Sequence, residues 1–185
     1  MKLKLKGAKP ALFLDLDNTV RYVDDPSIPC PNKPSDIKIY PKVIEKINNF
    51  KKAGFYIFGV SNQGGIEKGY LTEENCELLM STTNTLMDNS FDKIVWASKL
   101  ISEDRKPNPG MINKLALEYN IDLEASIMVG DKDSDLMCSL NAGIKEFFYA
   151  KDFFIEGHRA VAETLKKQQE EKKPTYLELI FDLMR

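Results

Sequence analysis

The chain has 185 residues, of which 43% are hydrophobic and 29% charged, and its formal net charge is -2. This length is enough for one domain with a full core, and we expect a single domain over residues 1–185. The small net charge argues against a protein whose main partner is nucleic acid, although a local basic patch would still allow one. No apolar run reaches membrane-spanning length, and the N-terminus lacks the apolar stretch of a signal peptide, so we expect no membrane association.

The cysteines and the histidine are too few and too scattered for a structural zinc site. Cys30, Cys76 and Cys138 are far apart, none has CxxC spacing, and His158 is the one histidine. A structural zinc ion needs four organised ligands. An odd number of cysteines without a signal peptide is typical of a reducing cytoplasm, where we expect the protein to reside. We interpret the three cysteines as small packing residues.

Strand and helix signals alternate along the whole chain. Apolar runs predict five strands, at residues 11–16, 55–60, 93–97, 126–129 and 145–149. Capping signals and apolar spacing predict helices between them, at residues 41–52, 72–89, 109–120 and 133–141. Residues 20–40 contain four prolines and are expected to be irregular. Residues 151–185 are interpreted as a helical extension.

The helical extension has two parts. A polar helix is expected to continue to about residue 173, and an apolar helix to span 175–184. We expect the apolar helix to pack on the core of its own domain, with a dimer contact as the alternative. The protein is therefore expected to be a monomer or a weak dimer.

The alternation of strands and helices predicts an α/β protein, a Rossmann-like three-layer α/β/α sandwich with a parallel sheet. Ligands of such sheets bind beyond the carboxyl ends of the strands, near the point where the strand order reverses. Four polar clusters lie at the ends of predicted strands or in the loops after them. We therefore expect the four clusters to meet at one edge of the sheet.

The first cluster, Asp15 and Asp17 with Thr19, ends an apolar run. Side chains alternate along a strand, so both carboxylates point to the same side, where they repel each other unless a cation or a shared proton intervenes. A divalent metal at a phosphate-handling site would relieve the repulsion. One carboxylate could attack a phosphoryl group, and the other could transfer protons. The alternative is a strand followed by an Asp/Asn-rich turn.

The second and third clusters fit the binding of a phosphoryl group. The second cluster is VSNQGG at residues 60–65, in which the hydroxyl of Ser61 and the small Gly64 and Gly65 lie at a strand end. Such a strand end can cradle a phosphate, although similar clusters also form ordinary turns. Lys106 lies in a segment stiffened by Pro107 and Pro109, where its charge could offset that of a phosphoryl intermediate. The alternative for Lys106 is an ordinary basic residue at the start of a surface helix.

The fourth cluster again places carboxylates after an apolar strand, in the sequence GDKDSD at residues 130–135. Asp131 beside Asp15 would form a hard oxygen site for Mg²⁺. The helix dipole alone could explain Asp133 and Asp135, because acidic residues favour a helix N-terminus, but it explains Asp131 less well.

Together the four clusters resemble the motifs of the haloacid dehalogenase superfamily of phosphohydrolases, which occur in order as DLDNT, Ser61, Lys106-Pro107 and GDKDSD. The resemblance implies that Asp15 is the nucleophile, that Asp17 is the general acid and base, and that Ser61 and Lys106 hold the phosphoryl group. It implies that Mg²⁺ is bound by Asp15, by the backbone carbonyl of Asp17 and by Asp131, with Asp135 in support. It also implies a five-stranded sheet of order 3-2-1-4-5, numbered along the chain, without a cap domain.

The stretches SNQGGIEKGYLTEE, DRKPNPGM and MVGDKDSD look like the heptose bisphosphate phosphatase and histidinol-phosphatase branch of that superfamily. This likeness makes Arg105 and Lys132 candidates for substrate contacts, and we include Thr19 and Asn62 among the substrate-binding residues. That branch usually carries a cysteine-rich zinc loop before the lysine motif, but residues 96–104 contain neither Cys nor His. Polynucleotide 3′-phosphatases share the DLD and NQ-G-I patterns.

We therefore expect a Mg²⁺-dependent phosphomonoesterase that forms an aspartyl-phosphate and acts on a sugar phosphate, a sugar bisphosphate or a similar small metabolite. A polynucleotide 3′-phosphatase is the first alternative, since an open site without a cap also suits macromolecular phosphoesters. A phosphate-accepting receiver domain is an alternative of another class. It would need an acceptor aspartate after the third strand, where the chain has Trp96, Ala97 and Ser98.

Overall fold

The computed structural model describes residues 7–25 and 27–171, so the predicted apolar helix at 175–184 lies outside the described residues. The described residues form a five-stranded parallel sheet of order β5-β4-β1-β6-β7. Its strands are β1 (Ala11–Leu14), β4 (Tyr56–Asn62), β5 (Lys93–Ala97), β6 (Ile127–Gly130) and β7 (Glu146–Tyr149). The expected order 3-2-1-4-5 and the α/β fold are confirmed.

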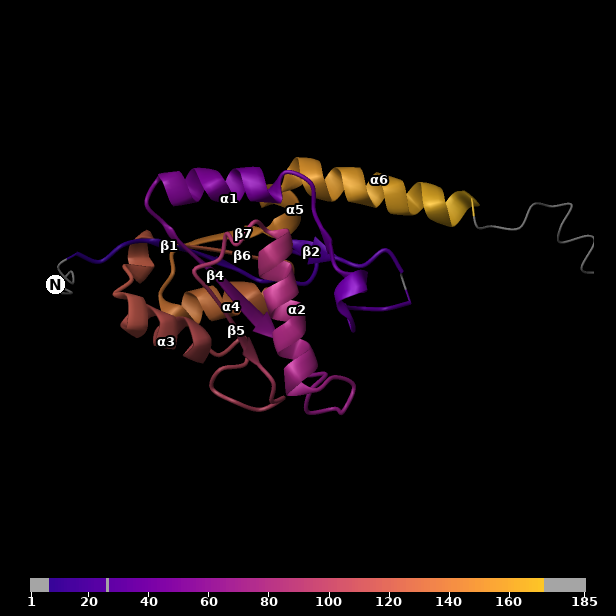
Figure 1. Ribbon diagram of the computed structural model, residues 1–185. Coiled ribbons are helices and arrows are strands. Elements are labelled where there is room, and N and C mark those ends of the chain that lie inside the picture. The colour runs from indigo at the N-terminus through magenta and orange to yellow at the C-terminus, as the bar shows by residue number, and fades with distance from the viewer. Residues whose placement is uncertain (1–6, 26, 172–185) are drawn as a thin grey trace, which may run out of the picture.

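Helices cover both faces of the sheet (Figure 1). One face packs against α1 (Val43–Lys52), α2 (Glu73–Leu86), α5 (Ala150–Phe153) and α6 (Ile155–Glu171). The other face packs against α3 (Gly110–Tyr119) and α4 (Asp133–Ala142). A short 3₁₀ turn, Leu123–Ala125, precedes β6.

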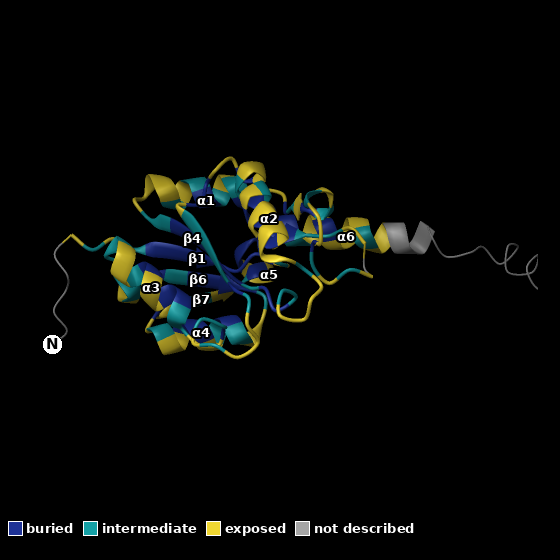
Figure 2. Ribbon diagram, turned by 60° about the horizontal axis from the view of Figure 1, so that its bottom comes forward, coloured by how far each residue is buried: buried dark blue, intermediate teal, exposed yellow. Residues whose placement is uncertain are grey.

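The central strand β1 is buried on both sides (Figure 2). Leu12 and Leu14 pack in the core cluster that holds α1 and α2, whereas Ala11 and Phe13 pack in the cluster that holds α3 and α4. This alternation follows from the two-residue repeat of a strand. Burial of each large apolar side chain contributes about 1.5–3 kcal/mol to the stability of the fold. The core therefore fixes the position of the residues that follow β1.

The segment 20–40 is more ordered than its prolines indicated. Arg21–Tyr22 (β2) and Lys38–Ile39 (β3) form an antiparallel pair, and Pro34–Asp36 form a 3₁₀ turn. The expectation of an irregular segment is therefore wrong at both of its ends. Asn18, with a φ of 61°, forms the turn that leads into β2, and its backbone N–H donates to the Arg21 carbonyl at 2.8 Å.

The extension after β7 is divided into α5 and α6, which meet at Phe154. The first turn of α6 lies so close to the start of α1 that a Cβ on Gly157 would be 2.1 Å from the Pro41 carbonyl oxygen. In the next position, His158 contacts the Thr19 carbonyl oxygen at 3.0 Å and stacks on Tyr40 at 3.8 Å. Of the helices in the described ranges, none has the length and apolarity to cross a membrane.

Replacing Gly157 tests this close contact. Alanine normally stabilises a helix relative to glycine by about 1 kcal/mol. Here the added methyl group would meet backbone, so Gly157→Ala is expected to destabilise the protein by about 2 kcal/mol in chemical denaturation. Exposed Glu163 on the same helix provides the control, because Glu163→Ala should change stability by at most about 0.5 kcal/mol. A Gly157→Ala protein at least as stable as the wild type would contradict the packing.

Candidate active site

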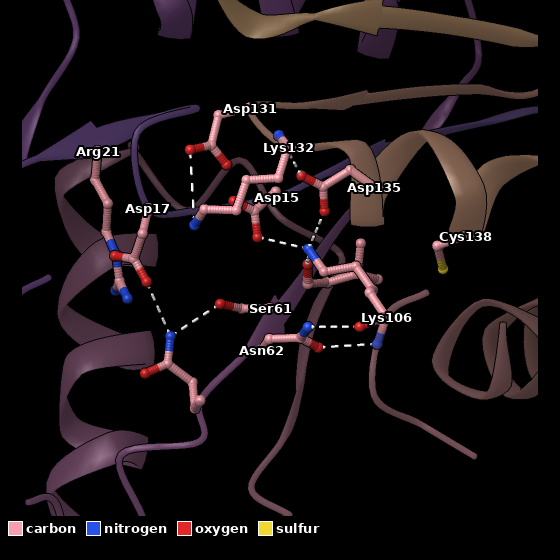
Figure 3. A network of polar contacts seen from close by, with 12 residues as sticks. Asp15, Asp17, Arg21, Ser61, Asn62, Lys106, Asp131, Lys132, Asp135 and Cys138 are labelled. Carbon is pink, nitrogen blue, oxygen red and sulfur yellow. Dashed lines mark hydrogen bonds and ion pairs between the residues drawn. The ribbon is translucent and has the colours of Figure 1, made fainter. Parts of the chain in front are cut away.

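The four polar clusters meet at the carboxyl edge of the sheet (Figure 3). Asp15 follows β1 directly, Ser61 lies near the end of β4, and Asp131 follows β6 directly. Lys106 comes from the loop between β5 and α3. Asp15 is fixed by its own backbone, whose N–H donates to the Val129 carbonyl of β6 at 2.9 Å. The strand order therefore brings these residues together, as the sequence predicted.

Lys106 is the electrostatic centre of this cluster. Its side chain is 2% exposed, and its Nζ lies 2.6 Å from Asp15 Oδ1, 2.6 Å from Asp135 Oδ1 and 2.7 Å from the Val60 carbonyl oxygen. Asp15 Oδ1 and the Val60 carbonyl accept hydrogen bonds from the ammonium group, and Asp135 Oδ1 is its ion-pair partner. Burial acts to lower the pKa of Lys106, but the charges of Asp15 and Asp135 outweigh burial and hold that pKa above its usual value. Lys106 is therefore a fixed positive charge.

Asn62 holds the backbone of Lys106 rather than facing a ligand. Its Nδ2 donates to the Lys106 carbonyl at 2.9 Å, and its Oδ1 accepts from the Lys106 backbone N–H at 3.0 Å. Both ends of the amide are thereby used. These contacts give Asn62 a supporting role for Lys106, and substrate binding by Asn62 stays a prediction.

Asp135 supports Lys106 from the other side. Its Oδ1 pairs with the lysine, and its Oδ2 accepts from the backbone N–H of Lys132 at 3.0 Å, which caps α4. The side chain folds over Gly130, where a Cβ would lie 2.4 Å from the Asp135 Cβ. Glycine at position 130 thus makes room for the contact. With both oxygens engaged, Asp135 is better placed to hold Lys106 than to bind a metal directly.

Asp15 and Asp131 are the best candidates for metal ligands. With Asp135 they offer oxygens that all lie within 4.8 Å of one another. Asp131 Oδ1 is buried and has no hydrogen-bond partner among the described residues. Burial raises the pKa of Asp15 to about 7 despite the opposing charge of Lys106, and burial also raises the pKa of Asp131. The carboxylates of this cluster carry more negative charge than Lys106 neutralises, and they offer only oxygen atoms as ligands. Both features fit a hard divalent cation such as Mg²⁺.

The carboxylate of Asp17 is held by two residues that the sequence had not singled out. Arg21 Nε lies 2.8 Å from Asp17 Oδ1, and Gln63 Nε2 donates to Asp17 Oδ2 at 3.0 Å. Gln63 Nε2 also donates to Ser61 Oγ at 2.9 Å. Gln63 follows Ser61 and Asn62 directly in the sequence. Arg21 lay in the segment expected to be irregular, so no sequence signal pointed to it.

Thr19 is not placed to bind substrate in this structure. It is fully buried, its hydroxyl has no hydrogen-bond partner within the described ranges, and its carbonyl contacts His158. These contacts do not support a contact between Thr19 and substrate, which stays a prediction. Thr19 is instead part of the turn that carries Asp17 and Arg21.

Arg105 and Lys132 lie at the rim. Arg105 is half-buried, and its Nη1 is buried without a hydrogen-bond partner in the described part of the chain. The side chain of Lys132 is 62% exposed, and its Nζ lies 3.7 Å from Asp131 Oδ2. A cavity of about 490 Å³ beside Lys106 is lined by residues 100–103 and 105–108. Arg105 therefore lines a cavity that adjoins Lys106.

Comparison with protein families and curated proteins agrees with this geometry. Residues 10–154 match the family model described as polynucleotide kinase 3 phosphatase. A D-glycero-beta-D-manno-heptose-1,7-bisphosphate 7-phosphatase from Helicobacter pylori is 32% identical over 73% of this chain and 80% of its own length. The protein of the same name from Escherichia coli K12 is 30% identical over 86% of this chain and 95% of its own length.

Solved structures show the same fold. A HAD-like phosphatase from Mesorhizobium loti superposes with a TM-score of 0.68 at 24% identity, covering 89% of this chain and 91% of that one. A D,D-heptose 1,7-bisphosphate phosphatase from B. bronchiseptica, solved with magnesium and phosphate, superposes with a TM-score of 0.67 at 21% identity. That match covers 86% of this chain and 99% of the other.

The two roles assigned to Asp131 and Asp135 predict different effects of matched Asp→Asn changes. Asp131→Asn is expected to weaken Mg²⁺ binding, measured by calorimetry, by about 10-fold or more. Asp135→Asn should affect Mg²⁺ binding less, but lower the free energy of unfolding by about 2 kcal/mol, because buried Lys106 loses a charged partner. An Asp135→Asn protein that loses Mg²⁺ binding as completely as Asp131→Asn would contradict the assignment.

Proposed function

The chain belongs to the haloacid dehalogenase superfamily of phosphatases as a relative of the heptose bisphosphate phosphatases, and on this basis we propose a Mg²⁺-dependent phosphomonoesterase that forms an aspartyl-phosphate. The proposed substrate is a sugar phosphate or sugar bisphosphate. The observation that carries the mechanism is the buried pair of Asp15 and Lys106, with a carboxylate at the strand end and a fixed cation against it.

In the proposed first step, a carboxylate oxygen of Asp15 attacks phosphorus, and the bond between phosphorus and the leaving oxygen breaks. Asp17 gives its proton to that leaving oxygen, which departs as an alcohol. Lys106 offsets the negative charge of the phosphoryl group, and the Ser61 hydroxyl donates a hydrogen bond to it. Asp15 suits the role of nucleophile because it is 6% exposed and held at a fixed place after β1.

In the proposed second step, water attacks the phosphorus of the aspartyl-phosphate while Asp17 takes a proton from that water. The bond between phosphorus and the Asp15 oxygen breaks, which restores the Asp15 carboxylate and releases inorganic phosphate. Asp17 alternates between acid and base, so its carboxylate must stay close to the line of attack in both steps.

Mg²⁺, bound by Asp15, Asp131 and the backbone carbonyl of Asp17, would supply positive charge to the phosphoryl oxygens. The oxygen-only ligand set and the partnerless Asp131 Oδ1 support this part of the proposal. Asp15 needs its negative charge to attack phosphorus. Positive charge near the carboxylate favours its ionised form, against the effect of burial.

The proposed substrate class has support at the rim of the site. The partnerless Nη1 of Arg105 and the exposed Lys132 could take a second anionic group, as in a sugar bisphosphate. The name of the matched family model makes a 3′-phosphorylated polynucleotide the alternative to test. The receiver-domain alternative has less support, because β5 ends at Ala97 with Ser98 next and supplies no acceptor aspartate.

Replacing the nucleophile tests the proposed chemistry. Asp15→Asn is nearly isosteric but cannot attack phosphorus, so we expect the folded variant to lose turnover by about 10⁴-fold or more. Phosphate release in Mg²⁺ would be measured on sugar mono- and bisphosphates, histidinol phosphate, nucleotides and a 3′-phosphorylated oligonucleotide. A folded Asp15→Asn protein that keeps appreciable Mg²⁺-dependent activity would refute the role of Asp15. If the wild-type protein hydrolyses only the oligonucleotide, the proposed sugar phosphate substrate is wrong and a 3′-phosphorylated polynucleotide takes its place.

Replacing the rim arginine tests the preference for a second anion. Arg105→Met keeps an unbranched side chain without the charge. It should raise KM for a sugar bisphosphate by about 10-fold or more, but change KM for the matching monophosphate much less. Exposed Lys52 on α1 provides a control, since Lys52→Met should leave both KM values unchanged. Equal effects of Arg105→Met on both substrates would contradict a second anion site.

A further inference from the structure

The carboxylate of Asp17 is fixed from two sides by residues that have no other role in the proposed chemistry (Figure 3). Arg21 Nε holds Oδ1 at 2.8 Å, and Gln63 Nε2 holds Oδ2 at 3.0 Å. A general acid and base must face the leaving oxygen in the first step and the attacking water in the second. The two contacts fix the orientation of the Asp17 carboxylate for these proton transfers.

Arg21 is itself held rigidly. It is fully buried, and its Nη1 donates to Thr83 Oγ1 at 2.6 Å and to the Leu79 carbonyl at 3.5 Å. Both acceptors belong to α2, so the guanidinium ties the Asp17 turn to that helix. A buried guanidinium needs a negatively charged partner, and Asp17 supplies it. The position of Asp17 is therefore linked to the packing of α2.

Gln63 connects Asp17 with the phosphate-binding serine. Its amide nitrogen has two hydrogens, which it donates to Asp17 Oδ2 and to Ser61 Oγ. The opposite amide orientation would set an oxygen against the Asp17 carboxylate, so the network itself assigns the nitrogen. Since Ser61 accepts from Gln63, the hydrogen of its hydroxyl remains available for a phosphoryl oxygen.

We propose that Arg21 and Gln63 are positioning residues that aim the Asp17 carboxylate, and that Gln63 also orients the Ser61 hydroxyl as a donor. This inference deepens the proposed function and rests on it. Neither residue touches the reacting atoms, so each acts through Asp17 or Ser61. A variant in which the Asp17 carboxylate is no longer held in this orientation should therefore show the same kinetic defect as a variant that lacks Asp17.

The experiment measures single-turnover phosphoryl transfer with two leaving groups. A poor leaving group, such as the alcohol of an alkyl phosphate, needs a proton, whereas p-nitrophenol leaves without much help. Gln63→Met keeps the length of the side chain and removes both donors. We expect it to slow the alkyl phosphate by about 10-fold to 100-fold and p-nitrophenyl phosphate much less. Asn113→Met, an amide replaced on the exposed face of α3, is the matched control and should change neither rate.

A double-mutant cycle tells positioning from a general structural role. In an Asp17→Asn background, Gln63→Met should slow the alkyl phosphate by no more than the effect that it has on p-nitrophenyl phosphate. An additive loss in that background, or equal slowing of both substrates by Gln63→Met alone, would overturn the proposal. Arg21→Lys provides a second test and should show the same leaving-group dependence, because a lysine cannot reproduce the guanidinium contacts. If the Arg21 variant does not fold, the Gln63 series decides.

The same measurements separate this inference from the proposed function. A wild-type protein that transfers no phosphoryl group would refute the function. A wild-type protein with activity, but with an Asp17→Asn variant that slows both substrates equally, would refute the role of Asp17. A leaving-group-dependent Asp17→Asn variant beside an unaffected Gln63→Met variant would refute the positioning role alone.

Discussion

The buried ammonium group of Lys106 determines how the rest of the site is arranged. It contacts oxygen atoms from three places in the fold: Asp15 after β1, the Val60 carbonyl in β4, and Asp135 in α4. A charge buried this deeply is costly unless its partners are in place. Three features position Lys106 and its partners: the order of the strands, the capping of α4 by Asp135, and the hydrogen bonds of Asn62 to the Lys106 backbone.

The same interaction explains the electrostatics of the site. Replacing a buried ion pair by apolar residues often leaves a protein as stable or more so, which favours a functional reason for this ion pair over a stabilising one. One lysine faces Asp15 and Asp135, and Asp131 lies beside them, so negative charge exceeds positive charge. The raised pKa values of Asp15 and Asp131 express that excess together with burial. A divalent cation and a phosphoryl group would enter a site with fixed charges of both signs.

Patterns of neighbouring residues were enough to predict the strands of a parallel sheet and the cluster of Asp15, Lys106 and Asp131, whereas the order of the strands came from the resemblance to a known superfamily. Each of these depends on where an apolar strand ends, which the sequence displays directly. The contacts of Asn62, Gln63 and Arg21 depend instead on which backbone or side chain comes within hydrogen-bonding distance after folding.

The segment 20–40 shows the same limit of prediction. Its four prolines indicated irregular structure, yet β2 and β3 pair at its ends, which sets Arg21 opposite Ile39. Burial of Thr19 could not be predicted either, since it results from the packing of Tyr40 and of His158 in α6.

The central claim is that Asp15 carries the phosphoryl group during turnover, and rapid acid quenching tests it most directly. Wild-type protein and an Asp17→Asn variant would be mixed with a radiolabelled phosphomonoester and Mg²⁺, quenched within one turnover and analysed by peptide mass spectrometry. We expect the label on the peptide that contains Asp15, at higher occupancy in the variant, because the water that ends the cycle then lacks its base. Release of phosphate without label on Asp15, or with label on another residue, would contradict the mechanism.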